Sequence, residues 1–340
     1  MGRDADRPMS IEQRYAEGLR GVYRDDDAAG RLTKMVKAQG QSPTSDDTVA
    51  NYGLTGSGEG KLSAPFAIIE KIFPGSLPAT AQGVGSCVAH NARNAALGTI
   101  ACEIAAGKPD EVSGKVEGKP EVSEEAQRDG VFSTESLYWF RNHGGPDGWS
   151  CEHAAEVMTS QSGLWVRKNY TEIGIDLTRY SAKTEVRWGR PLPPQNVQEL
   201  GKKNLIRTVT RISSYENLRD LMANGYCVSS CGGESFSAQR DENGVAQQTR
   251  EGWAHAMAYL AVDDRDAVKR KYGEPLVLVQ NSWGPRWGSG GRRVLDTQLD
   301  IPLGSFWAKW SDISRRSALA YSSIVGWPPQ TFDNWTGGWF

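Results

Sequence analysis

Cys87 closes a short glycine-containing segment, QGVGSC (82–87), where a helix is expected to begin. Residues 87–107 are rich in alanine, with apolar side chains at helical spacing, which predicts a buried helix. A thiol at a helix N-terminus meets the positive end of the helix dipole, which favours the reactive thiolate. The backbone N–H groups there and the Gln82 amide could both donate to a developing oxyanion. Alone, the segment fits a buried structural cysteine as well as a nucleophile.

Two more polar side chains come from the second half of the chain. His255 lies in WAHAMAYLAV (253–262), where alanines on both faces predict a strand covered on both sides, and Asn281 follows the apolar strand 276–280. The midpoint of residues 255 and 281 is 268, inside the charged loop 263–275. Antiparallel pairing about this loop therefore places His255 beside Asn281, which could fix the tautomer of the ring. Without that pairing, a hydrogen-bonded core histidine is the simpler interpretation.

Three segments in this order, GSC, WAHAMAYLAV and NSWGPRWGSGG, resemble the papain family of cysteine peptidases, over roughly residues 64–325. The similarity looks closer to the bacterial and viral branches than to the secreted plant and animal enzymes. The resemblance implies that Cys87 is the nucleophile, His255 the base and Asn281 the orienting residue. It also implies that Gln82 and the Cys87 N–H form the oxyanion hole. Trp283 is implied to shield the Asn–His contact from water.

The family fold is α+β, with a helical subdomain, a β-barrel-like subdomain and the active site in the cleft between them. The chain shows the same order, with helical patterns in residues 64–195 and strand patterns in 196–325. Helices are expected to begin near Ser133, Ser150 and Ser214. We expect strands at 205–212, 228–231, 254–262 and 276–280, and an exposed insertion at 108–127.

The two ends of the chain lie outside this match. Residues 1–63 are predicted to form an arm, with helices within 1–39 and a linker at 40–63. This arm is either an inhibitory propeptide or a docking arm. The tail, residues 326–340, needs a surface for its aromatic side chains, on its own domain or on a partner, and we favour a partner. These side chains are Trp327, Trp335, Trp339 and Phe340.

Composition narrows the function further. The net charge of −2 argues against nucleic-acid binding or a polybasic membrane surface, and no apolar stretch is long enough for a membrane helix. No secretory signal or cofactor or metal motif is visible, so we expect a cytoplasmic protein without cofactors. Five cysteines are few for 340 residues and fit a reducing compartment. Cys227 and Cys231 are accordingly expected to be buried thiols.

Two functions remain open. The first is a peptidase that hydrolyses a peptide or protein substrate through an acyl-enzyme. The alternative is a papain-like fold used as a structural or binding component, for example in a phage or virus particle, with reduced or no catalysis. Three features motivate the alternative: the lack of a signal, the aromatic tail, and Gln82, which lies five residues before Cys87 where the family usually has six.

Overall fold

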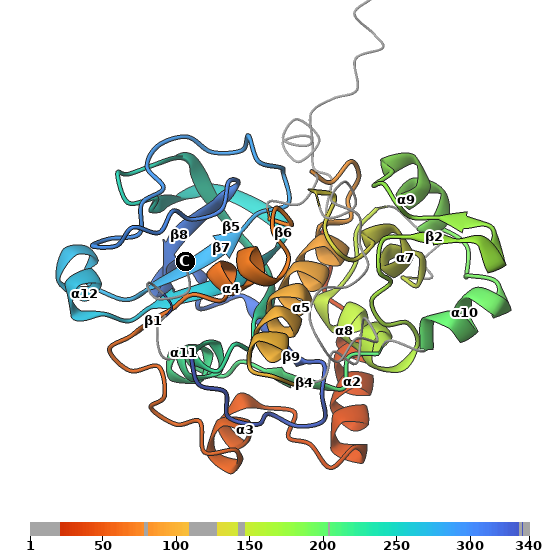
Figure 1. Ribbon diagram of the computed structural model, residues 1–340, viewed down its shortest axis with the longest axis horizontal. Coiled ribbons are helices and arrows are strands. Elements are labelled where there is room, and N and C mark those ends of the chain that lie inside the picture. The colour runs from red at the N-terminus through yellow and green to blue at the C-terminus, as the bar shows by residue number, and fades with distance from the viewer. Residues whose placement is uncertain are drawn as a thin grey trace, which may run out of the picture.

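An antiparallel sheet organises one half of the molecule in Figure 1. The computed structural model describes residues 21–77, 81–108, 128–141, 147–202, 205–332 and 335. The strands of the sheet follow the order β4-β9-β5-β6-β7-β8, and β1 pairs with β6. Their bounds are β1 (Leu62–Ser63), β4 (Thr208–Arg211), β5 (Val228–Arg240), β6 (Ala246–Asp263), β7 (Leu276–Gln280), β8 (Ser305–Lys309) and β9 (Ser317–Ser322).

Helix α5 (Cys87–Ala105) lies between the sheet and the other half of the molecule, which is mainly helical (Figure 1). It packs against β6, and nearly all of its side chains are buried, as the alanine-rich sequence predicts. The predicted α+β class is therefore confirmed. The helical half contains α7 (Thr134–Trp139), α8 (Cys151–Ser160), α9 (Ala182–Trp188), α10 (Gln195–Gly201) and the small pair β2 (Asn169–Tyr170) and β3 (Ile175–Asp176).

The helix starts expected at serines are confirmed for α7, α8 and α11 (Tyr215–Ala223). The hydroxyls of Ser133, Ser150 and Ser214 each accept a hydrogen bond from the backbone N–H three residues later. Such caps satisfy backbone donors that have no partner within the helix. These local signals can be read from sequence because both partners lie within one turn.

Two segments carry structure that their composition does not predict. The polar segment 40–63 contains α3 (Ser45–Asn51) and β1, so the expectation of a linker is wrong there. The charged loop 263–275 contains α12 (Asp266–Tyr272), which buries Val268 and begins with an acidic residue. An acidic first turn and the basic last turn at 269–271 both suit the helix dipole.

Both ends of the described chain pack against the central fold. Leu32 and Val36 of α2 (Asp26–Ala38) and Val49 of α3 belong to the same buried core as α5 and the sheet. Trp327 is fully buried with its ring edge-on to Tyr226. Trp335 also belongs to this core and contacts Phe332, another tail residue. The described residues do not include residues 1–20, most of the expected insertion, Trp339 or Phe340. The predicted domain boundaries stay a prediction.

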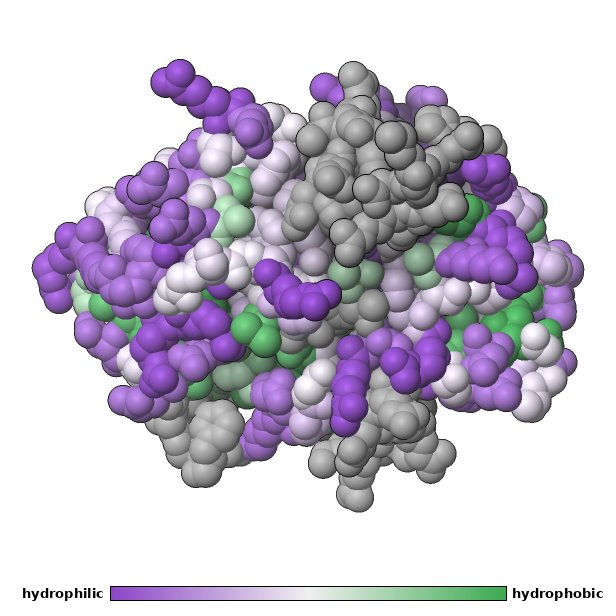
Figure 2. Space-filling view, turned by 90° about the horizontal axis from the view of Figure 1, so that it is seen from above, coloured by the Kyte–Doolittle hydropathy of each residue, from purple (hydrophilic) through white to green (hydrophobic). Residues whose placement is uncertain are grey.

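Figure 2 shows the face seen from above in Figure 1. On the described part of this face, small hydrophobic areas are separated by hydrophilic side chains. The remaining helices complete the fold: α4 (Pro65–Ile72) packs on α5, and α13 (Trp310–Ile313) follows β8.

Candidate active site

His255 and Asn281 meet as the antiparallel pairing predicts. The Nε2 atom of His255 lies 2.9 Å from Oδ1 of Asn281. The cause is the pairing of β6 with β7, in which Ala258 faces Gln280. Cys87 is the first residue of α5, which packs against β6. The catalytic roles of the three side chains stay a prediction.

Aromatic rings surround the imidazole of His255. The ring of Trp283 lies 4.9 Å from it, centroid to centroid, at an interplanar angle of 32°. Trp253 contacts both Trp283, at 4.6 Å, and His255, at 6.2 Å. Both His255 and Asn281 are buried, and a hydrogen bond in such surroundings is stronger than one in water. The shielding role of Trp283 stays a prediction, and Trp253 was not among the residues predicted from sequence.

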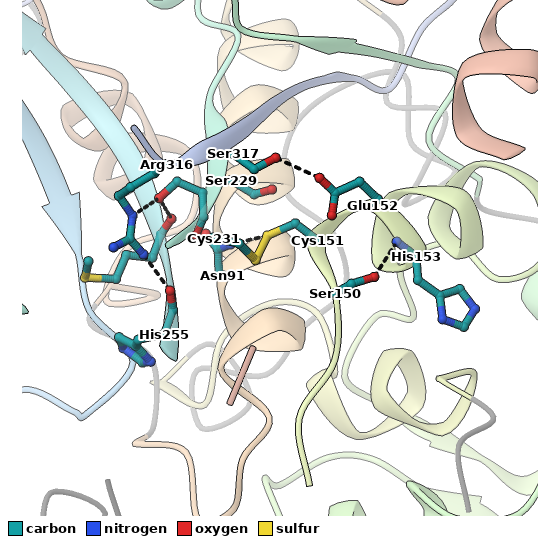
Figure 3. The surroundings of a disulfide bond; sticks show 12 residues. Asn91, Ser150, Cys151, Glu152, His153, Ser229, Cys231, His255, Arg316 and Ser317 are labelled. Carbon is teal, nitrogen blue, oxygen red and sulfur yellow. Dashed lines mark hydrogen bonds between the residues drawn. A yellow bond between two sulfur atoms is a disulfide. The ribbon is translucent and has the colours of Figure 1, made fainter. Parts of the chain in front are cut away.

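Arg316 holds the strand that carries His255, although no local pattern points to it. Its guanidinium donates to the His255 carbonyl at 2.5 Å, and its Nη1 lies 3.2 Å from the Glu234 carboxylate. Figure 3 shows Arg316 reaching the backbone of His255. Because Arg316 is buried and paired, it fixes the backbone of His255 while leaving its ring to Asn281 and Trp283.

Gln82 is anchored to the residue that follows Asn281. The backbone N–H of Gln82 donates to the Ser282 carbonyl at 2.9 Å, and the Ser282 hydroxyl donates to Oε1 of Gln82. The Nε2 group of Gln82 donates to the Val84 carbonyl at 2.7 Å. This last bond lies within the short loop and uses one of the two amide hydrogens.

Burial dominates the electrostatics of the site. Cys87 and His255 are both fully buried. Burial lowers the pKa of His255 to about 3, the hydrogen bond to Asn281 acts in the opposite direction, and the charge of Arg316 lowers the pKa further. In this state the imidazole is therefore neutral at neutral pH.

A crossing segment, residues 21–23, connects β6 with the loop before α8. The Gly21 N–H donates to the carbonyl of Ala254, the residue before His255, at 3.1 Å. The Gly21 carbonyl accepts from Trp149 N–H, and the Tyr23 N–H donates to the Trp149 carbonyl, both at 3.1 Å. The chain therefore passes directly beside His255 from one half of the molecule to the other.

A disulfide joins Cys151 of α8 to Cys231 of β5 across the two halves of the molecule (Figure 3). The expectation of a buried thiol is therefore wrong for Cys231, while Cys227 lies outside any disulfide, as expected. Composition failed here because 80 residues separate the two cysteines in the chain. Cys231 pairs in register with Ala256, next to His255. The bond thus links the helical half to the strand beside β6.

A groove of about 940 Å³ opens beside the site. Its wall is aromatic near His255, with polar side chains farther along. The aromatic and polar residues that line it include Phe236, Trp253, Trp283, Trp287, Ser237, Thr249 and Arg286. Within the described residues, no group of three or more His, Cys, Asp or Glu side chains could hold a metal ion. Among the described helices, none has the length and apolar character needed to span a membrane.

Comparison with known proteins gave solved structures but no match to a family model or a curated protein. Xylellain, a cysteine protease from Xylella fastidiosa, is 15% identical over 73% of this chain and 84% of its own, with a TM-score of 0.46. Digestive procathepsin L2 proteinase from Tenebrio molitor is 15% identical over 92% and 81%, with a TM-score of 0.45.

The proform of Amb a 11, a ragweed pollen cysteine protease, is 13% identical over 92% of this chain and 91% of its own, with a TM-score of 0.44. These similar structures are papain-like cysteine proteases, the family that the sequence resembles. The assignment to a bacterial or viral branch stays a prediction.

Proposed function

We propose that this chain is a latent cysteine peptidase with Cys87 as nucleophile, His255 as base and Asn281 as orienting residue. The observation that carries the proposal is the buried 2.9 Å contact between His255 and Asn281 beneath Trp283. It is supported by α5, which begins at Cys87 and packs on the strand of His255. A side-chain amide that fixes an imidazole is the arrangement that a thiol–imidazole pair requires.

In the proposed reaction, the Cys87 thiolate attacks the scissile carbonyl and forms an acyl-enzyme. His255 takes the thiol proton and passes it to the leaving amine, and water then hydrolyses the thioester. The Cys87 N–H and the Gln82 amide stabilise the oxyanion. The substrate is a peptide or protein whose chain continues into the aromatic groove at Trp253 and Trp283.

Latency is proposed because the crossing segment lies beside His255 while both reactive side chains are fully buried. Burial lowers the pKa of His255 to about 3, which favours the neutral imidazole at neutral pH in this buried state. Displacing residues 21–23 lets water reach the ring and brings its pKa back toward the ordinary value. This favours the inhibitory role for the N-terminal arm over the docking role.

The proposal is tested by incubating the full chain at pH values from 4 to 7, followed by mass spectrometry and a fluorogenic peptide assay. We expect cleavage within the arm, turnover of the peptide and incorporation of a thiol-directed epoxide at Cys87. Cys102 and Cys227 are internal controls, because burial raises the pKa of both thiols. The Cys87→Ala variant should lose all three signals.

Epoxide labelling or turnover that persists in Cys87→Ala would contradict the assignment of the nucleophile. A wild-type chain that stays silent at every pH would favour the alternative of a binding or assembly component. In that case its partner would be sought at the arm and at the tail residues beyond Trp335. Location also belongs to the proposal: the low cysteine count suggests a reducing compartment such as the cytoplasm, whereas the Cys151–Cys231 disulfide favours an oxidising environment, and a virion is the alternative.

A further inference from the structure

The loop before Cys87 is held by side chains from a distant part of the sequence. The Gly83 N–H donates to the hydroxyl of Tyr180 at 2.8 Å, and this hydroxyl donates to Oε2 of Glu185 at 2.8 Å. The Ser86 hydroxyl donates to the same oxygen at 2.7 Å. One buried carboxylate oxygen therefore fixes both ends of the segment 83–86, immediately before the proposed nucleophile.

Close packing accompanies these hydrogen bonds. A Cβ atom at Gly83 would lie 2.3 Å from Cβ of Ala182, the first residue of α9. No other residue type fits at this distance, so glycine lets the loop touch the start of the helix. Ser86 precedes α5 but makes no side-chain cap bond to that helix. Its hydroxyl donates a hydrogen bond to Glu185 instead.

Glu185 is itself rigidly placed. Its carboxylate is fully buried, and Oε1 lies 3.4 Å from Nε2 of His90, one helical turn after Cys87. Burial alone would raise the pKa of the Glu185 carboxyl, but His90 and the bond from Ser86 hold it below its ordinary value. The carboxylate is thus an acceptor for both loop contacts.

A buried ion pair anchors the start of α9. The Arg167 Nη2 atom donates to Glu135 at 2.9 Å, and the other oxygen of Glu135 accepts from the Ser181 N–H at 2.8 Å. At the far end of α9, Trp188 stacks on Trp139 at 4.1 Å. Both ends of α9, the helix that carries Glu185, are therefore held in place.

We infer that Glu185 and Tyr180 are positioning residues for Cys87, holding its loop through Ser86 and Gly83. The inference rests on the proposed peptidase function and adds two residues that no sequence motif indicates. The hydrogen bonds and the glycine contact with α9 brace this loop. A loop that is free to shift by about 1 Å loses catalysis steeply, because attack geometry is lost.

The first test replaces Tyr180 by Phe in the full chain, which is activated by the same incubation between pH 4 and 7 as wild type. Tyr170→Phe is the matched control, because Tyr170 is also a buried tyrosine of the helical half, but its hydroxyl donates to the Val166 carbonyl. Active sites are titrated with the thiol-directed epoxide, and kcat is expressed per titrated site. We expect Tyr180→Phe to lower kcat about tenfold and to leave KM within about twofold, while the control keeps both.

A purely structural role would lower the number of titrated sites and the melting temperature without changing kcat per site. An unchanged kcat per site in Tyr180→Phe would therefore overturn the inference. Ser86→Ala serves where Tyr180→Phe does not fold, because it removes the other contact with Glu185 and creates no large cavity. It should lower kcat per site about threefold to tenfold, and no change would again overturn the inference.

A conservative replacement of Glu185 distinguishes the effect of its hydrogen bonds on the loop from the effect of its negative charge. Glu185→Gln keeps an oxygen that can accept both hydrogen bonds, whereas Glu185→Ala removes the acceptor. We expect kcat per site to fall less than about threefold in the first and about tenfold in the second. Equal losses in both would overturn positioning by these hydrogen bonds. A wild-type chain without turnover or epoxide incorporation would instead contradict the proposed function itself.

Discussion

His255 makes a hydrogen bond through its ring and a second one through its backbone. Asn281 contacts the ring and can fix its tautomer, and Arg316 donates to the backbone carbonyl and holds the strand in position. The cost of this placement is desolvation, which lowers the pKa of the ring to about 3. In the unfolded chain the same ring has a pKa of about 6.5.

The first prediction concerns stability against pH. Between pH 6.5 and 3 the unfolded chain binds a proton at residue 255 that the folded chain does not, so the free energy of unfolding falls as the pH falls. Relative to His255→Gln, wild type should lose about 1.4 kcal/mol per pH unit over this window. Urea unfolding at several pH values measures the difference, in which the other titrating groups cancel. Parallel curves for the two proteins would contradict the burial of a neutral ring.

At the residue scale, the sequence was sufficient to predict only the contact that follows from one symmetric pair of strands. His255 and Asn281 were predictable because both lie the same number of residues from the turn that joins their strands. Arg316 and Glu185 were not, because they reach the site from segments whose packing no local pattern encodes. Nor could the sequence show that the loop at Cys87 is bonded to α9.

At the scale of elements, the disulfide between Cys151 and Cys231 adds a covalent link between α8 and β5. Asn91, one turn into α5, reinforces it by donating to the Ser230 carbonyl at 3.4 Å. The helix of Cys87 and the strand beside His255 are therefore held together at the same place (Figure 3). Closing a loop of 80 residues mainly restricts the unfolded chain.

The second prediction is that Cys151→Ser combined with Cys231→Ser lowers the free energy of unfolding by about 2–4 kcal/mol. A thiol reductant should destabilise wild type by a similar amount and leave the double variant unchanged. Alkylation in denaturant without reductant, followed by mass spectrometry, should find three reactive thiols in wild type. Five modified cysteines would show that the bond does not form.

The elements themselves were predictable to different degrees. Serine-capped helices and apolar strands such as β7 follow from short-range pattern. The extension of β5 and β6 into a long hairpin was not predictable, because the strand residues beyond Cys231 and before Ala254 are mostly polar or glycine and few of them are buried. Helix α12 was missed because its charges resemble those of a loop, and Val268 is its one buried residue.

At the scale of the whole molecule, the N-terminal arm is part of the fold. Residues 21–23 pair with both halves, and α2 and α3 share the common core. Burial of Trp327 and Trp335 shows that this part of the aromatic tail packs on its own domain. Partner binding by the rest of the tail stays a proposal.

The third prediction tests the crossing segment. Tyr23→Pro removes the N–H that donates to Trp149, whereas Tyr23→Ala removes the ring but keeps that N–H. Iodoacetamide should modify Cys87 about threefold to tenfold faster in the proline variant than in the alanine variant at pH 7, as expected for one lost hydrogen bond. Mass spectrometry of the Cys87 peptide measures the rate. Equal rates in the two variants would contradict a closing role for this bond.

The central claim is that the imidazole of His255 takes the proton from the sulfur of Cys87. It is tested most directly by the pH profile of Cys87 alkylation, resolved by site, in Tyr23→Pro with and without His255→Gln. With His255 present, the account predicts rapid alkylation already near pH 6. With Gln in its place, the rate should rise toward the ordinary thiol pKa of about 8.5. Two profiles that coincide near this ordinary value would contradict the account.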